Sequence, residues 1–462
     1  MDKLKISACV IVRNEERNMK RWLQGAAVFA DEILVVDTGS TDRTCALARE
    51  GGARLRFFPW CDDFAAAKNY ALQQATGNWI VFLDADEYFT ESSSRALREV
   101  LKELQPQKNV AGLISHYRSV DPERHNCLVG SGWQIRIFRN LPAIRFQGRV
   151  HEALRDTGSS GIFQRTELTF IHTGYTMSRQ QAKCARNLAI LQKMIAEQGG
   201  ERAGDYTYLT DCYMGLGQYD RAIHYARLAI EYDAQSGILG QLRKNYGCLF
   251  TAMQRGSYPE AEQEEALLQA AGKYPDWGEL YWYQGYFYFQ CMDYERAEPL
   301  LQRTVEMADL AVHTGNPLED GGDELEAVLP HVYYVLGCIA KDKGQQVQAV
   351  QFWQDTLRRY PYHALAFRAM YRLLQEQPAV EIIEFLGQFY EREADRGFLA
   401  QELELFPYTA VYLYYVMPEP KSYAAAMAAG KYSLAARIAA YPLRGLDGMQ
   451  LQQEKRGNDV EA

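Results

Sequence analysis

The sequence has no long apolar segment, no closely spaced cysteine pair and no excess of basic residues. No run approaches the ~20 apolar residues needed to cross a bilayer, and residues 1–5 lead into a strand-like segment, which is not the pattern of a signal peptide. The nine cysteines are scattered singly, so they form neither a disulfide framework nor a zinc-ligand spacing. We expect a cytoplasmic protein with reduced thiols and no transmembrane segment.

The charge balance narrows the range of partners. The net charge is −9, with 24% charged and 47% hydrophobic residues, as in a soluble globular protein. An acidic chain is poorly suited to general nucleic-acid binding, because phosphate backbones require a basic face. We therefore expect no nucleic-acid partner. A length of 462 residues predicts at least two domains.

Short apolar runs alternate with helical stretches over the first part of the chain. The predicted strands are Ile6–Val12, Ile33–Val36, Leu55–Phe58, Trp79–Leu83, an arginine-rich pair at Trp133–Arg139 and Arg145–Gly148, and Leu168–Ile171. Three helices are predicted in this part: one that ends near Val28, one that begins at Asp42 with Thr41 as its cap, and one over Phe64–Ala75. This alternation predicts an α/β domain with a mostly parallel sheet covered on both faces. Ligands of such sheets bind at the carboxyl ends of the strands, where the polar clusters of this sequence fall.

From about residue 178 the pattern becomes helical. Four related turn segments recur at residues 216–222, 255–261, 291–297 and 343–349, and their final alanines lie 39, 36 and 52 residues apart. The first two spacings are close to the ~34-residue period of a tetratricopeptide hairpin, and the long third interval, with glycines at 315, 321 and 322, reads as a loop insertion. The alternative is an irregular helical bundle without true repeats. We predict domains at residues 1–177 and 178–452 and a disordered polar tail at 453–462.

Two carboxylates follow the fourth predicted strand. Asp84 and Asp86 are two positions apart at a strand end, so we expect them to point in roughly the same direction. Hard oxygen ligands suit Mg²⁺ or Mn²⁺, which often bridges to substrate phosphates. The alternative is a solvated acidic loop or a helix cap.

Four motifs occur in a recognisable order, at residues 9–16, 32–42, 68–72 and 84–87. Together they resemble family 2 glycosyltransferases of the Rossmann-like GT-A fold. Followed by a tetratricopeptide-like helical domain, the sequence looks like the branch that includes peptide S-glycosyltransferases and relatives of lipopolysaccharide-core glucosyltransferases. The resemblance covers about residues 5–176 in motif detail.

The resemblance implies roles for individual residues. Those expected to contact the donor nucleotide sugar are Val12, Asn14, Glu15, Asp37, Lys68 and Asp84. Many family members carry a second aspartate where this chain has Thr38, so the contact with the base departs from the family pattern. For Lys68 the alternative is a solvated helix lysine. Asp86 is expected to bind the metal, and His172 to be a further metal ligand or diphosphate contact; the alternative for His172 is a structural role.

An inverting transfer requires a base that removes the proton of the acceptor. Glu152 is the candidate, with His151 as its neighbour or substitute. The alternative for Glu152 is an ion pair with one of four nearby arginines, at 136, 139, 145 and 149. Those arginines could instead meet the diphosphate or an anionic acceptor.

The resulting prediction is a metal-dependent, inverting glycosyltransferase that uses Mn²⁺ or Mg²⁺ and moves a hexose from a UDP-sugar to a peptide or protein side chain. The helical domain would present a surface for that acceptor or support homo-oligomers. Two alternatives stay open: a surface-polysaccharide or lipooligosaccharide glycosyltransferase with a lipid-linked acceptor, and a tetratricopeptide scaffold protein without activity.

Overall fold

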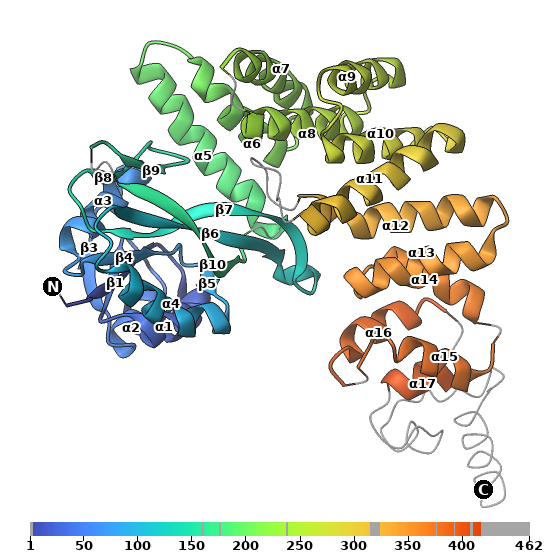
Figure 1. Cartoon of the computed structure of the whole chain (residues 1–462), viewed down its shortest axis with the longest axis horizontal. Helices are drawn as coiled ribbons and strands as arrows, with labels where there is room; N and C mark the ends of the chain where they lie inside the picture. The colour runs from blue at the N-terminus through green and yellow to red at the C-terminus, as the bar shows by residue number, and fades with distance from the viewer. Residues whose placement is uncertain are drawn as a thin grey trace, which may run out of the picture. The chain divides into compact units, whose positions relative to one another are not determined.

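The computed structural model describes residues 3–158, 161–174, 177–236, 239–314, 324–375, 377–391, 393–406 and 410–416 (Figure 1). The chain divides into two compact units, one of Met1–Gln284 with Glu306–Ala327 and one of Gly285–Val305 with Val328–Ala462. Because the first unit continues to Gln284, its limits do not coincide with the domain boundary predicted after residue 177, which stays a prediction. The predicted polar tail and the glycines of the predicted loop insertion lie outside the described residues.

The strands are confined to the first part of the described chain. They are β1 (Ile6–Val12), β2 (Glu32–Asp37), β3 (Arg54–Phe57), β4 (Trp79–Phe82), β5 (Glu87–Phe89), β6 (Val110–Asp121), β7 (Cys127–Arg139), β8 (Ile144–Gln147), β9 (Ala153–Asp156) and β10 (Ile162–His172).

The α-helices lie between the early strands and then follow one another without strands. They are α1 (Glu16–Phe29), α2 (Thr44–Glu50), α3 (Phe64–Gln74), α4 (Glu91–Leu104), α5 (Met177–Glu197), α6 (Tyr206–Gly215), α7 (Tyr219–Ser236), α8 (Leu239–Arg255), α9 (Glu260–Lys273), α10 (Gly278–Gln290), α11 (Tyr294–Thr314), α12 (Glu324–Asp342), α13 (Gln346–Arg359), α14 (Ala364–Leu374), α15 (Ala379–Leu386), α16 (Arg396–Leu403) and α17 (Ala410–Val416). The predicted succession of an α/β domain and a helical region is confirmed.

The main sheet has the strand order β3-β2-β1-β4-β7-β6-β10-β5. The first four strands of that order pair in parallel, as does β10 with β6. The remaining pairings, β4 with β7, β7 with β6 and β10 with β5, are antiparallel, so the described sheet is mixed, with its parallel part at one side.

Two local predictions were wrong. The arginine-rich strands do not pair with each other: β7 pairs with β4 and with the long strand β6, which leaves β8 to pair with β9. Thr41 does not cap α2, because the residue at the cap position is Arg43 and the Thr41 hydroxyl donates to Asn14 Oδ1 at 3.3 Å. The carboxylate of Asp42 accepts from the backbone N–H of Thr44 instead, at 2.9 Å, and the helix begins there.

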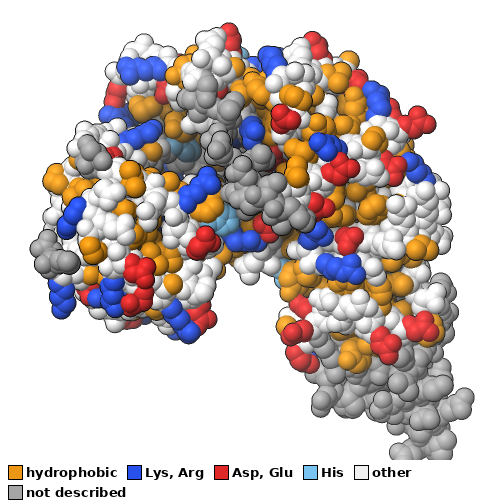
Figure 2. All heavy atoms as spheres, viewed as in Figure 1, with side chains coloured by type: hydrophobic (Ala, Val, Ile, Leu, Met, Phe, Trp, Pro, Cys, Tyr) orange, Lys and Arg blue, Asp and Glu red, His pale blue; other side chains and the backbone are white. Residues whose placement is uncertain are grey.

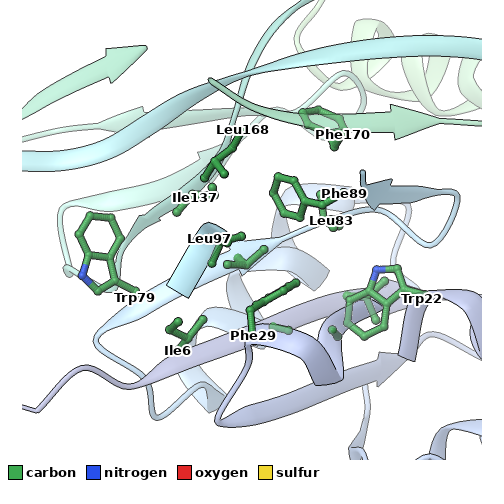
Figure 3. Close-up of a cluster of buried hydrophobic side chains, with 14 of the residues drawn as sticks. Ile6, Trp22, Phe29, Trp79, Leu83, Phe89, Leu97, Ile137, Leu168 and Phe170 are labelled. Atoms are coloured by element: carbon green, nitrogen blue, oxygen red, sulfur yellow. The ribbon is translucent and has the colours of Figure 1, made fainter. Parts of the chain in front are cut away.

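Both faces of the sheet are covered, as predicted. On one face, apolar side chains of α1 and α4 pack against the strands, as with Phe29, Leu97 and Phe170 (Figure 3). On the other face, α3 and the β8–β9 ribbon cover Phe82 and Phe138. Because β1 is buried on both sides, its sequence is apolar except for the buried Ser7 and does not alternate.

The four recurring turn segments of the sequence occupy equivalent places among the helices. They join α6 to α7, α8 to α9, α10 to α11 and α12 to α13. Each segment therefore connects the two helices of a hairpin, and the final alanine is buried in three of the four segments, at 222, 297 and 349.

The described surface mixes charges of both signs. Figure 2 shows Asp and Glu side chains interspersed with Lys and Arg over the face that it draws. Within the described ranges, no helix is both long enough and apolar enough to cross a membrane.

Candidate active site

Strand register brings distant parts of the chain together at the site. In the antiparallel pair of β5 and β10, His172 lies opposite Glu87, the residue after Asp86. The pairing continues beyond the strands, because the backbone N–H of Thr173 donates to the carbonyl of Asp86 at 2.9 Å. The segment that ends β10 is thus fixed beside the acidic turn after β4.

Asp86 faces two cationic or potentially cationic side chains. Its Oδ2 lies 3.7 Å from His172 Nε2 and 3.3 Å from Lys183 Nζ, which is contributed by α5. Burial alone would raise the pKa of Asp86, but the contacts with His172 and Lys183 hold that pKa well below its usual range. The carboxylate is therefore ionised at neutral pH and available to a cation.

Gly174 permits this arrangement. A Cβ at this position would lie 2.1 Å from Asp86 Oδ2 and 2.6 Å from His172 Nε2, well inside van der Waals contact. Only glycine lets the backbone approach the carboxylate and the imidazole this closely.

A second group of charges surrounds Lys68. Its Nζ lies 2.8 Å from Asp84 Oδ1 and 2.7 Å from Glu152 Oε1, and the side chain is only 4% exposed. The alternative of a solvated helix lysine is therefore wrong. Burial would lower the pKa of Lys68, but the two carboxylates raise it above the usual lysine value, so the ammonium stays charged. Burial would likewise raise the pKa of Asp84, but Lys68 and Arg136 lower it.

The four arginines near Glu152 are engaged elsewhere. Arg136 forms a bidentate pair with Glu87 at 2.7 and 2.8 Å, and Arg149 pairs with Glu197 at 2.6 Å. Arg139 and Arg145 donate to backbone carbonyls. Glu152 forms an ion pair with Lys68, so the alternative of a pairing with one of these arginines was wrong.

Asp84 and Asp86 thus do different things. Ala85 between them is buried in the core, and each carboxylate has its own partners. We expected the two carboxylates to point in roughly the same direction, but they contact different groups. Asp84 belongs with Lys68, and Asp86 with His172.

The loops after β1 and β2 lie side by side, since Val12 pairs with Asp37 in the parallel register. Asn14 has a left-handed backbone, with φ of 56°, and its N–H donates to Ser40 Oγ at 2.9 Å. The Asp37 carboxylate is 3% exposed and accepts from the backbone N–H groups of Gly39 and Ser40 at 3.0–3.2 Å. In this arrangement Asp37 shapes the loop beside the predicted nucleotide pocket.

Thr38 is occupied as well. Its backbone N–H and its hydroxyl both donate to the carbonyl of Val12, at 2.9 and 3.1 Å. Glu15 lies in the same loop pair, and its backbone N–H donates to Thr44 Oγ1 at 2.8 Å. Hydrogen bonds therefore join the loops after β1 and β2, which carry the predicted nucleotide-binding residues, but Val12 and Asp37 are themselves buried.

Asp86 and His172 fit a divalent cation. One carboxylate and one imidazole face each other, and Ser119 Oγ contacts His172 Nδ1 at 3.2 Å, a contact of the kind that orients metal-ligating imidazoles. Within the described residues, no group of three or more His, Cys, Asp or Glu side chains has metal-site geometry. Mg²⁺ and Mn²⁺ are commonly held by few protein ligands, with water and substrate phosphates completing the shell.

The sequence pattern did not indicate Lys183 or Gly174. Lys183 lies on a helix outside the recognised motifs, and its only local signal is a basic residue on α5 shortly after the last strand. Gly174 directly follows His172-Thr173, and only the structure shows how near its Cα lies to Asp86.

Comparisons with known proteins match two segments of the chain. Residues 7–163 match the family model for glycosyl transferase family 2, and residues 210–236 match a tetratricopeptide repeat. Residues 7–163 of this chain are thus similar to family 2 glycosyltransferases, and a tetratricopeptide-like segment lies in the helical region that follows.

Three relatives are similar to parts of this chain. A TPR repeat-containing protein of Synechococcus elongatus is 40% identical over 33% of this chain and 36% of its own length. The SPbeta prophage-derived glycosyltransferase SunS of Bacillus subtilis is 27% identical over 41% and 45%. The lipopolysaccharide core biosynthesis glycosyltransferase LpsC of Rhizobium meliloti is 34% identical over 34% and 60%. The chain therefore spans between about a third and three fifths of these relatives' lengths.

Among solved structures, the chain is similar to S. aureus TarS 1–349. The identity is 15% over 68% of this chain and 93% of that chain, with a TM-score of 0.30. A score this low supports no further structural argument.

Proposed function

We propose that this protein is a metal-dependent, inverting glycosyltransferase that moves a hexose from a UDP-sugar to a peptide or protein side chain. The observation that carries the proposal is the pair formed by Asp86 and His172, whose Oδ2 and Nε2 atoms lie 3.7 Å apart where β10 ends. Glu152 belongs to a separate charged cluster with Lys68 and Asp84. The family 2 match over residues 7–163 supports the reaction class. Neither the donor base nor the acceptor follows from that match.

The two clusters divide the reaction between them. Asp86 and His172 would hold Mn²⁺ or Mg²⁺, and a bound ion supplies positive charge to the departing diphosphate. Lys183, already 3.3 Å from Asp86 Oδ2, would add a second positive charge on that side. The loops with Val12, Asn14 and Asp37 would hold the nucleotide.

Glu152 would act on the acceptor side. Its carboxylate accepts the acceptor proton while the acceptor atom bonds to the anomeric carbon. The bond between that carbon and the diphosphate oxygen breaks, and UDP departs with the electron pair. Lys68 keeps Glu152 oriented through the 2.7 Å contact, and holds Asp84 at 2.8 Å toward the sugar side. His151 lies next to Glu152 in the chain, but its ring stacks on Tyr208, which favours Glu152 as the base.

A nucleotide-sugar screen tests this proposal. Purified protein is incubated with UDP-glucose, UDP-galactose or UDP-N-acetylglucosamine, and UDP release is measured with Mn²⁺ and with excess EDTA. We expect turnover of one donor with Mn²⁺ and its loss with EDTA. Equal rates in both conditions would contradict metal dependence. Release of GDP from a GDP-sugar, or of ADP from an ADP-sugar, as fast as UDP is released from the UDP-sugar would contradict the base assignment.

A lipid-linked acceptor is the second candidate, because the relative LpsC is a lipopolysaccharide core biosynthesis glycosyltransferase. Incubation of the protein with radiolabelled donor and cell lysate separates the two. Label in a protein band supports a peptide or protein acceptor, and label in the lipid fraction supports the second candidate. If calorimetry detects no UDP binding with Mn²⁺ present, the scaffold alternative gains and the enzyme proposal fails.

A further inference from the structure

The segment that carries Glu152 has an unusual backbone. Gly148 has a φ of +102°, and His151 has a φ of +53°, the left-handed region that residues with a Cβ rarely adopt. Such a conformation persists only where the surroundings fix it. Because His151 directly precedes Glu152, the backbone conformation at His151 sets the direction in which the Glu152 side chain leaves the chain.

Three contacts hold this segment. The carbonyl of Arg149 accepts from the backbone N–H of Phe64 at 2.9 Å, and the Arg149 guanidinium pairs with Glu197 of α5 at 2.6 Å. The ring of His151 stacks on Tyr208 of α6, with 4.4 Å between ring centroids and 9° between ring planes. The first two contacts act at Arg149, two residues before His151, and only the third acts on His151 itself.

The contacts also differ in how firmly they hold. The Arg149 and Glu197 side chains are 36% and 47% exposed, and ion pairs with that much solvent access hold weakly. His151 is also exposed and Tyr208 is half-buried, but a parallel aromatic stack constrains both the position and the tilt of the imidazole ring. On the other side of the segment, Glu152 Oε1 lies 2.7 Å from Lys68 Nζ, so the carboxylate is held between α3 and the stacked His151.

Tyr208 does not belong to the sheet. It lies in α6, the first helix of the hairpin whose second helix is α7, and the tetratricopeptide match spans residues 210–236 of this hairpin. The hairpin lies in the same compact unit as the whole sheet.

We propose that Tyr208 is a positioning residue for the transfer reaction: through the His151 stack, the first helical hairpin fixes the Glu152 carboxylate in its working place. The inference rests on the proposed function, because it takes Glu152 as the base. It assigns the start of the repeat region a part in completing the catalytic site, in addition to any part in acceptor binding. The sheet domain by itself would lack this support.

Variants of Tyr208 in the full-length chain test the inference. Tyr208→Ala removes the stack, Tyr208→Phe keeps the ring, and Tyr232→Ala, an exposed tyrosine on α7, is the matched control. With UDP-glucose and Mn²⁺ as the probe, we expect Tyr208→Ala to lower kcat for donor hydrolysis about 10- to 100-fold, since small misplacement of a reacting group has effects of that size. KM for the donor should stay within about twofold, and Tyr208→Phe should restore kcat.

A second measurement does not depend on turnover. Hydrogen–deuterium exchange of the peptide covering residues 148–154 should be faster in Tyr208→Ala than in the wild type. Tyr208→Phe and Tyr232→Ala should exchange as the wild type does. Unchanged exchange in Tyr208→Ala would overturn the inference, whichever donor the enzyme uses.

Glu152→Gln separates failure of this inference from failure of the proposed function. If Glu152→Gln abolishes turnover and Tyr208→Ala leaves kcat unchanged, the positioning role of Tyr208 is wrong and the base assignment stands. If Glu152→Gln turns over at the wild-type rate, the base assignment is wrong and the inference falls with it. A KM increase in Tyr208→Ala without a change in kcat would also overturn the inference, because it would indicate a binding role.

Discussion

Two aspartates, one in the sheet domain and one among the helices, have opposite environments. Asp233 on α7 is 1% exposed, and Asn245 Nδ2 donates to it at 2.7 Å. Burial raises its pKa, and the neutral amide lowers it too little to compensate. The Asp86 side chain is 16% exposed, and although its partial burial raises the pKa of its carboxyl, His172 and Lys183 lower it by more.

The opposite pKa shifts distinguish a carboxyl with a structural role, Asp233, from an ionised carboxylate that can bind a cation, Asp86. The Asn245 amide also donates to Thr207 at 2.9 Å, so the polar group in the helices links three helices with neutral partners. The group around Asp86 consists of a carboxylate, an imidazole and an ammonium at the end of strands, where ligands bind in sheets of this kind. Burial of an acidic residue is therefore not by itself a sign of function; its partners decide.

The largest expected effect is on turnover, at Asp86. Asp86→Asn keeps the shape and removes the charge, so we expect a rate loss of about 10²–10³-fold or more. The melting temperature near neutral pH should also fall, because His172 and Lys183 stabilise the ionised carboxylate in the folded state. Asp233→Asn is the matched control, with turnover close to wild type. Equal losses in both variants would mean that Asp86 is no more functional than Asp233. Steady-state rates of UDP release measure both.

The second largest effect is expected for Gly174→Ala, on the affinity for Mn²⁺. The added Cβ would lie 2.1 Å from Asp86 Oδ2, so the carboxylate or the strand end must shift. We expect Mn²⁺ affinity in the presence of UDP to fall about 10- to 100-fold, as for other changes that disturb metal-ligand orientation. Electron paramagnetic resonance of free Mn²⁺ measures this affinity. Gly272→Ala on α9, where a Cβ would meet nothing within 4 Å, serves as the control, and wild-type affinity in Gly174→Ala would show that the close approach is unimportant.

Lys68→Met should lower the free energy of unfolding. It leaves the carboxylates of Asp84 and Glu152 without their shared ammonium, at an expected cost of about 2–3 kcal/mol in the free energy of unfolding near neutral pH. The pKa of Asp84 is lowered in the folded wild type, so its contribution is present above the usual aspartate pKa and is lost as the pH falls. The deficit of Lys68→Met should therefore shrink below about pH 4. Urea unfolding at several pH values, with the exposed Lys102→Met as control, measures it; a pH-independent deficit would contradict the electrostatic explanation.

Asp233→Asn has the smallest expected effect, within about 1 kcal/mol at neutral pH. The pKa of Asp233 is raised in the folded state, so the wild type loses stability as the pH rises from the usual aspartate pKa through that raised value. Asp233→Asn should remove this fall, because an amide does not titrate. If the pH dependence of unfolding is the same in the variant and the wild type, the neutral environment assigned to Asp233 is wrong.

Much of the sheet could be predicted because its signals are local. The apolar run of β1 and the acidic turn after β4 are continuous in sequence, and their positions in the structure follow from strand order. Likewise, the recurring turn segments located the helical hairpins from their spacing alone.

The parts of the site that were missed depend on contacts between distant segments. Lys183 on α5 and Gly174 approach Asp86 only in the folded chain. Lys68 was predicted as a site residue, but its burial follows from its contacts with Asp84 and Glu152. Similarly, Thr41 has the residue type of a helix cap, but its hydroxyl donates to Asn14 Oδ1 from another loop. Local propensity cannot report such competition between partners.

The central claim is that Asp86 and His172 hold a divalent cation against the diphosphate of the donor. A crystal soaked with MnCl₂ and UDP tests it directly, because the anomalous signal of manganese locates the ion. We predict a peak about 2.0–2.2 Å from Asp86 Oδ2 and from His172 Nε2, with UDP phosphate oxygens completing the shell. Manganese and UDP bound elsewhere, with Lys183 still on Asp86, would contradict the account.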